Sequence, residues 1–83
     1  MANVTVRFFA RYAELTGRDS ATVVVPGTSA TVADVLELVR ESIPGARELP
    51  PRPVAAVNLR QVNLDARVQD GDEVALLPPL SGG

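Results

Sequence analysis

The sequence predicts an α+β domain in which one main helix covers one face of a mixed sheet of four to five strands. Several short segments rich in β-branched residues alternate apolar and polar positions, as strands do. A single longer segment has helical periodicity instead. The chain has 83 residues, of which 46% are hydrophobic. That is enough for one small core and leaves no room for a separate catalytic domain.

The first strand is expected at Val4–Phe9, because apolar and polar residues alternate there. Alternation places Val4, Val6 and Phe8 on one face. The next segment, Ala10–Thr16, is short and fits one turn of helix closed by a glycine.

The second strand is expected at Ala21–Val25, where β-branched residues precede Pro26. The two strands are spaced for an antiparallel hairpin with a broad loop. The main helix is expected at Thr31–Ser42, with Thr31 as its N-cap and Asp34 completing a capping box. Its apolar stripe, which we expect to pack on the sheet, consists of Val32, Val35, Leu36, Val39 and Ile43.

The second half of the chain begins with an irregular, proline-rich connection at Gly45–Pro53. Strands are then expected at Val54–Asn58, Gln61–Asn63 and Glu73–Leu77, the last one preceded by the turn Asp70–Asp72. The resulting order is β-β-α-β-β-β. If the first and last strands lie parallel in the middle of the sheet, this is the β-grasp, or ubiquitin-like, arrangement.

Asp70, Asp72 and Glu73 place three carboxylates within four residues, which raises the possibility of a metal site. A turn with Gly71 in a left-handed conformation explains the same residues, and no further ligands are near in the sequence. We therefore predict no metal site.

The composition excludes most independent enzymes. The chain has no Cys and no His, and all eight of its positive charges are Arg. It therefore has no thiolate, no imidazole base and no lysine for a Schiff base. A net charge of −2 argues against binding to nucleic acid. No apolar run approaches the ~18 residues of a membrane span, and the start lacks the features of a signal peptide. We expect a cytoplasmic protein without membrane contact.

We assign residues 1–77 to the β-grasp domain and residues 78–83 to a flexible C-terminal tail that ends in Gly-Gly. Gly82 and Gly83 carry no side chains, so together with Ser81 they allow the tail to enter a narrow passage. Pro78 and Pro79 stiffen its base. The carboxylate of Gly83 is ionised at pH 7 and is a poor electrophile. It must be activated by a partner, most simply as an acyl-adenylate.

One helix leaves the other face of the sheet uncovered. With Val74 and Leu76 turned toward the helix, Ala75 and Leu77 point away from it, beside Phe9. We expect these apolar groups to be exposed at the root of the tail, where a partner would dock. The predicted docking residues are Phe9, Ala75, Leu77, Pro78, Pro79 and Leu80.

Three segments, Phe8–Gly17, Ala56–Asn58 and above all Asp70–Gly83, resemble the small subunit of molybdopterin synthase, a β-grasp sulfur carrier. The resemblance covers essentially the whole chain. It implies that an ubiquitin-activating-like adenylyltransferase uses ATP to adenylate the carboxylate of Gly83. A sulfur donor protein then converts it to a thiocarboxylate. It also implies that the tail inserts into the large synthase subunit, where sulfur builds the dithiolene of molybdenum cofactor. The chain would bind no cofactor and would be non-catalytic on its own.

Other functions stay open from the sequence. The same carrier chemistry could serve thiamine, cysteine or tRNA thiolation. A protein modifier joined to targets through Gly83 is a second class, and a plain binding module is a third. The identity of the sulfur acceptor separates the carriers, covalent adducts identify a modifier, and a binding module would tolerate the loss of Gly83.

Overall fold

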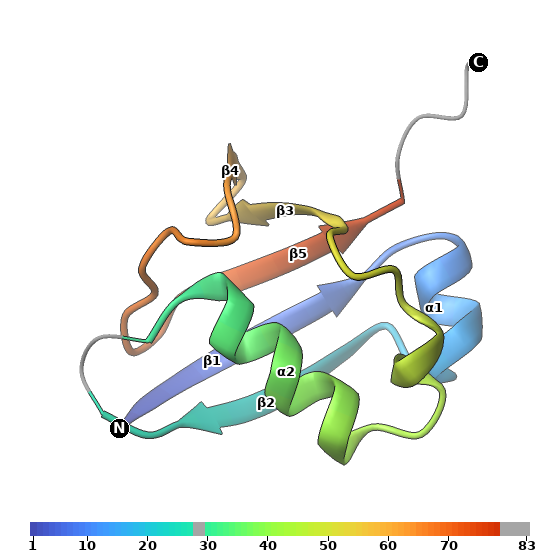
Figure 1. The fold of residues 1–83 in the computed structure, drawn as a ribbon, viewed down its shortest axis with the longest axis horizontal. Coiled ribbons are helices and arrows are strands. Elements are labelled where there is room, and N and C mark those ends of the chain that lie inside the picture. Colours follow the sequence, from blue (N-terminus) through green and yellow to red (C-terminus); the bar gives the residue numbers. More distant parts are fainter. Residues whose placement is uncertain (28–29, 79–83) are drawn as a thin grey trace.

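The computed structural model describes residues 1–27 and 30–78 of the chain. Its five strands form one mixed sheet in the order β2-β1-β5-β3-β4 (Figure 1). The strands are β1 (Ala2–Phe8), β2 (Ser20–Val25), β3 (Val54–Val57), β4 (Arg60–Val62) and β5 (Glu73–Leu77). The helices are α1 (Arg11–Thr16), α2 (Val32–Ser42) and the 3-10 turn η1 (Ala46–Glu48). The predicted α+β class is confirmed.

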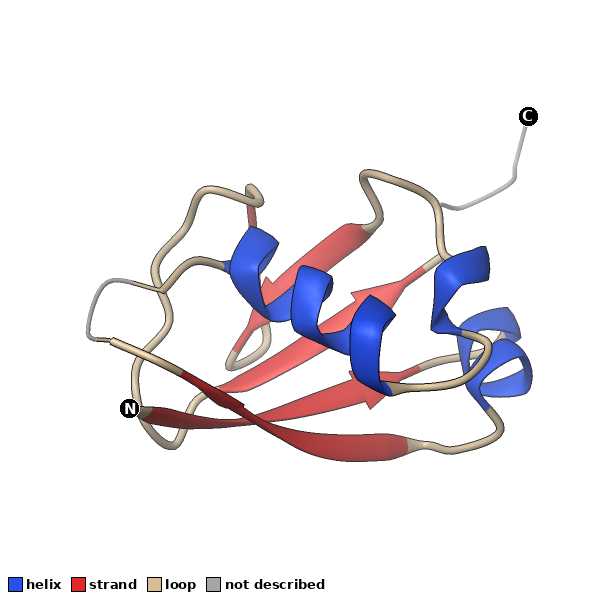
Figure 2. Cartoon of the chain, turned by 60° about the horizontal axis from the view of Figure 1, so that its bottom comes forward, coloured by secondary structure: helices blue, strands red, loops and turns tan. Residues whose placement is uncertain are grey.

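The first and last strands pair in parallel at the centre of the sheet, with Thr5 opposite Glu73 and Phe8 opposite Leu76. The strands β2 and β3 flank this pair and run antiparallel to their neighbours. This is the β-grasp topology that the order of elements predicted. Helix α2 crosses one face of the sheet (Figure 2), and among the described residues no element covers the other face.

Helix α2 begins where the sequence predicted. The backbone N–H of Thr31 donates to Asp34 Oδ2 at 2.9 Å, and the N–H of Asp34 donates to Thr31 Oγ1 at 3.3 Å. These bonds satisfy two of the N–H groups that a helix start leaves free. The predicted stripe is buried and packs on Val4, Val6 and Phe8 from β1. No helix in the described part of the chain is long and apolar enough to cross a membrane.

The element boundaries differ slightly from expectation. β1 starts at Ala2 rather than Val4, because pairing with β2 continues to Ala2 opposite Val25. It ends at Phe8, so Phe9 lies just beyond it. The proline-rich connection was expected to be irregular throughout but contains η1, whose residue Ala46 is completely buried. The side chain of Arg40 fixes this connection by donating to the carbonyl oxygens of Leu49 and Pro50.

The acidic turn before β5 holds separate parts of the chain together. Asp70 Oδ1 accepts from the backbone N–H of Asn3 at 2.7 Å. Asp72 Oδ2 accepts from the N–H of Gln69 at 2.7 Å, and its Oδ1 accepts from Asn58 Nδ2 at 3.0 Å. Carboxylates that accept such bonds serve as structural acceptors. Among the described residues, no group of three or more His, Cys, Asp or Glu is arranged to hold a metal ion.

Replacing Asp72 with alanine should destabilise the domain by about 1–3 kcal/mol, because it leaves the N–H of Gln69 and the amide of Asn58 without their acceptor. Urea unfolding measures the change in free energy. Asp65→Ala is the matched control, since Asp65 is exposed and makes no side-chain hydrogen bond within the described chain. Equal effects of the two changes would contradict a structural role for the turn.

Gly45→Ala should destabilise the domain by about 2–4 kcal/mol, because the cost of backbone strain at a positive φ adds to the cost of a steric overlap. Gly45 has a φ of 87°, and a Cβ there would overlap the carbonyl oxygen of Leu15 in α1. Gly17→Ala is the matched control: Gly17 has a φ of 72° but open space around the added Cβ. Thermal unfolding of both variants separates the cost of the positive φ from the cost of the overlap. Equal losses of stability in the two variants would rule out a contribution from the overlap.

Candidate functional site

The uncovered face of the sheet carries an apolar surface where β5 ends. Strand register places Ala75 between Arg7 and Ala56, and Leu77 opposite Val54. All of these side chains share one face, because residues two apart on a strand point the same way. We call the five residues Phe9, Val54, Ala56, Ala75 and Leu77 the open-face patch.

Exposure within the open-face patch is uneven. Phe9 is 38% exposed, and Leu77 and Val54 are half-buried. Ala75 is only 6% exposed, contrary to the expectation that it would be accessible. Arg7 and Ala56 flank it on the two neighbouring strands and leave its small methyl group little free area. Phe9 and Leu77 therefore supply the area that a partner could cover.

Arg7 is the charged residue beside the open-face patch. Its guanidinium carbon lies 5.6 Å from the centroid of the Phe9 ring. One of its nitrogens lies 3.9 Å from Glu73 Oε1, with both side chains partly exposed. A cation over an exposed aromatic face contributes about 0.5–1 kcal/mol to stability. An exposed ion pair contributes about 0–1 kcal/mol. Arg7 thus lies between Glu73 and the Phe9 ring at the edge of the open-face patch.

The chain turns sharply directly after Phe9. Ala10 has a φ of 51° and a ψ of −123°, a conformation that residues other than glycine rarely adopt. The turn starts α1, where Tyr12 N–H donates to the Phe9 carbonyl at 3.0 Å and Ala13 N–H donates to the Ala10 carbonyl at 3.0 Å. Strain of this kind costs of order 1–3 kcal/mol and concentrates at functional sites. Here it ends β1 at the open-face patch.

Tyr12 is the only phenol in the chain. It is 3% exposed, and its hydroxyl has no hydrogen-bond partner among the described residues. Burial raises the pKa of Tyr12, and the nearby Arg11 opposes this only in part. The phenol is therefore neutral at pH 7 and is unsuited to act as a base.

The predicted tail falls almost entirely outside the described residues. Pro78 is the last residue described and is half-buried at the end of β5. The remaining predicted site residues, Pro79, Leu80, Ser81, Gly82 and Gly83, lie outside the described residues. The open-face patch is thus the part of the predicted site whose geometry can be stated, and it lies at the root of the tail.

Three residues at the site were not singled out from the sequence. Val54 and Ala56 belong to the open-face patch because β3 pairs antiparallel with β5, and Arg7 contacts Phe9. Alternation within the predicted strands could have assigned faces to them. The register that brings Val54 beside Leu77 was not available, because it depends on how two distant segments pair.

Comparison with known proteins gives consistent relatives. A molybdopterin synthase sulfur carrier subunit from Arabidopsis thaliana is 39% identical over 80 residues, which cover 96% of this chain and 82% of that protein. SAMP1 from Haloferax volcanii, a small archaeal modifier protein, has a solved structure that superposes with a TM-score of 0.84. It is 31% identical, and the match covers 99% of this chain and all of that one.

A further solved structure is a complex of subunits 1 and 2 of molybdopterin-converting factor from Helicobacter pylori. The matched chain is 26% identical, with a TM-score of 0.67 over 98% of this chain and 99% of that one. The family model that matches is the ThiS family, over residues 6–83. With the β-grasp fold in place and relatives above 30% identity along its whole length, this chain belongs to the ThiS family.

Proposed function

We propose that the chain is a sulfur carrier, the small subunit of molybdopterin synthase. The observation that carries the proposal is similarity along the full chain to molybdopterin synthase sulfur carrier subunits, at 33% identity for the human protein and 39% for the Arabidopsis protein. The chain contains no cysteine that could hold sulfur as a thiolate or persulfide. Sulfur would then be carried at the main-chain carboxyl of Gly83.

The proposed chemistry is performed on this chain by its partners. An ubiquitin-activating-like adenylyltransferase binds ATP, and a carboxylate oxygen of Gly83 attacks the α-phosphate with release of pyrophosphate. The acyl-adenylate makes the carbonyl carbon electrophilic, which the free carboxylate is not. A sulfide equivalent from a sulfur donor protein displaces AMP and leaves a thiocarboxylate. The carrier itself holds no cofactor and contributes no catalytic side chain.

The proposed role of the folded domain is docking. Phe9 and Leu77 form a partly exposed apolar surface at the end of β5, where the chain leaves the sheet. A large subunit that covers this surface would hold the start of the tail in one position. The tip of the tail would then lie close to the active site of the large subunit. The Helicobacter complex supports a two-subunit assembly of this kind. A cytoplasmic location stays a prediction.

A second candidate is a ubiquitin-like modifier that joins target proteins through Gly83. The specific observation in its favour is the 31% identity to the small archaeal modifier protein of Haloferax volcanii. Both functions begin with the same adenylate and diverge at the nucleophile, which is sulfide for a carrier and a target amine for a modifier. Covalent adducts of the chain in cell extract would identify the modifier, and the identity of the sulfur acceptor would separate molybdenum cofactor from thiamine, cysteine or tRNA thiolation.

Gly82→Val should abolish sulfur loading, because a branched side chain widens the tail where a narrow passage must admit it. The measurement is the intact mass after incubation with ATP, a sulfur donor and the cognate activating enzyme. The wild-type chain should gain one oxygen-to-sulfur exchange, and a chain lacking Gly83 should not. Ser81→Ala adds no bulk and should load normally. Normal loading of Gly82→Val would refute the requirement for a narrow tail.

Phe9→Ser should weaken binding to the large subunit about tenfold or more, because an aromatic anchor at the centre of an interface is worth roughly 1–2 kcal/mol or more. Calorimetric titration with the purified large subunit measures the Kd. Val24→Ser is the matched control: Val24 is 48% exposed on the same face but pairs with Asn3, at the other end of β1 from Phe9. A larger loss for Val24→Ser would place the interface elsewhere on the sheet.

A further inference from the structure

The strand β2 forms one edge of the sheet and has none of the usual protection. Natural edge strands are kept short, charged or interrupted by proline so that they do not pair with other chains. At the opposite edge β4 follows this rule, with three residues that include the exposed Arg60. In contrast, β2 is six residues long and contains neither a charge nor a proline, and its Val24 is 48% exposed. Figure 1 shows β2 as the outermost strand.

The free backbone groups of β2 can be assigned from its pairing with β1. Phe8 N–H donates to the carbonyl of Asp19 at 2.8 Å, so Asp19 points its backbone toward β1. In an antiparallel ladder, successive residues point their backbone N–H and C=O groups alternately toward the paired strand and away from it. The N–H and C=O groups of Ser20, Thr22 and Val24 therefore point outward from the sheet. An added strand would find its hydrogen-bonding partners there.

A groove runs beside this edge on the helix side of the sheet. It has a volume of about 320 Å³. Its lining consists of Val25, Pro26, Asp34, Glu37, Leu38 and Glu41. Pro26, directly after β2, and Leu38 give the groove an apolar wall, while the carboxylates of α2 form an acidic rim. One face of an added strand at β2 would contact this groove.

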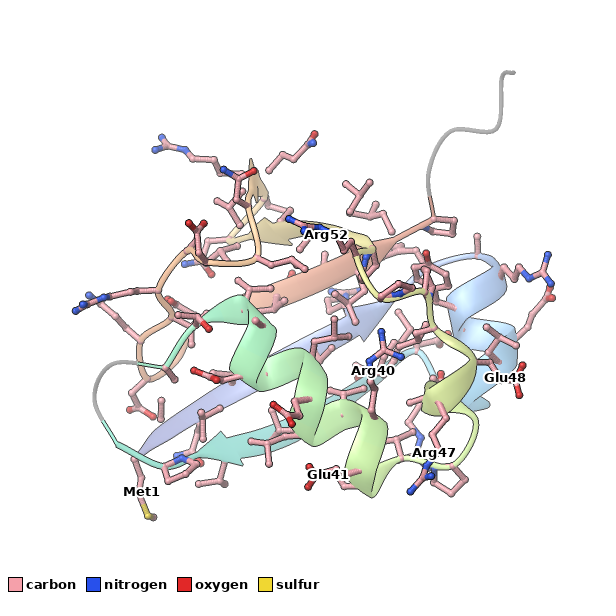
Figure 3. All side chains as sticks on the ribbon, viewed as in Figure 1. Met1, Arg40, Glu41, Arg47, Glu48 and Arg52 are labelled. Carbon is pink, nitrogen blue, oxygen red and sulfur yellow. The ribbon has the colours of Figure 1, made fainter. Side chains whose placement is uncertain are left out.

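No ion pair among the described residues includes Glu37 or Glu41, and the cations that line a neighbouring hollow with them are Arg40 and Arg47. Glu37 and Glu41 are four residues apart on α2, a spacing at which like charges repel. The nearest cation in the helix, Arg40, is instead bonded to the carbonyl oxygens of Leu49 and Pro50. Figure 3 shows Glu41 pointing away from both Arg40 and Arg47. The one ion pair in the described residues joins Arg7 of β1 and Glu73 of β5, in the sheet and far from this rim on α2.

We propose that the edge of β2 binds an extended segment of a partner protein in which arginine or lysine alternates with apolar residues. The segment would add to the sheet as a further strand, through the outward groups of Ser20, Thr22 and Val24. Its apolar side chains would contact Pro26 and Leu38, and its cations would neutralise Glu37 and Glu41. The proposal does not depend on the sulfur-carrier function, since it involves neither the open-face patch nor the tail.

A second copy of this chain fits the edge less well than a basic segment does. Antiparallel pairing of two β2 edges would place both α2 helices on the same side of the joined sheet. The acidic rims, with Glu37 and Glu41 on each, would then face one another across the new pairing and repel. Charge complementarity thus favours a basic occupant.

The test is titration of the isotope-labelled full chain with a short peptide that alternates arginine and valine, followed by amide chemical shifts. Saturable shifts should be largest at Ser20, Thr22 and Val24, and they should weaken with added salt. A peptide that alternates glutamate and valine should not bind. Equal binding of the two peptides, or no saturable shift at these amides at millimolar peptide, would overturn the proposal.

Two variants separate the backbone and charge contributions. Thr22→Pro removes an outward N–H and leaves the ladder to β1 intact, so it should raise the Kd of the basic peptide about tenfold or more. The double change Glu37→Gln with Glu41→Gln should raise it roughly three- to tenfold, with Glu14→Gln as the matched control without effect. Circular dichroism checks that each variant folds. If Thr22→Pro fails to fold, the double variant Glu37→Gln with Glu41→Gln still tests the site. Concentration-dependent shifts in β2 without peptide would instead indicate a second copy and overturn the proposal.

Discussion

The parallel pairing of β1 with β5 determines where every other part of the molecule lies. The inward residues of this pair, such as Val6 opposite Val74, are completely buried beneath α2. The outward residues of the same two strands lead to Phe9 and Leu77 at the end where the chain leaves the sheet. A single register therefore builds the core on one face and the proposed docking surface on the other. A shift by one residue would exchange the two faces and destroy both.

The polar groups of the domain are arranged for structure rather than for chemistry. The carboxylates of Asp70 and Asp72 accept hydrogen bonds from Asn3, Gln69 and Asn58 at the end of the sheet opposite the tail. Tyr12 is buried and neutral, and the chain has neither cysteine nor histidine. Such a domain offers rigidity and surfaces to a partner. Rigidity and surfaces suit the proposed carrier role, in which the reactions of Gly83 would take place in the active sites of other proteins.

Much of the fold could be predicted because it depends on local patterns. The helical stripe, the capping box of Thr31 and Asp34, and the bounds of β5 were all predicted as the structure has them. Features that depend on register were not. Ala75 was expected to be exposed, yet neighbours from β1 and β3 bury it. Strained backbone was also missed: Ala10 and Leu59 have φ values of 51° and 73°, and neither residue type signals a left-handed conformation.

The uncovered face and the free edge of the sheet differ in chemistry, so the two proposed partner surfaces are distinct. The open-face patch is apolar, with Phe9 as its most exposed member, and it lies where the tail begins. The β2 edge combines unpaired backbone groups with an acidic rim on α2. An apolar surface binds by excluding water, whereas an acidic edge attracts basic segments in a salt-dependent way. In the proposed function, the chain would meet an activating enzyme, a sulfur donor and an acceptor in turn. Two surfaces of different chemistry allow one partner to hold the domain while another takes the tail.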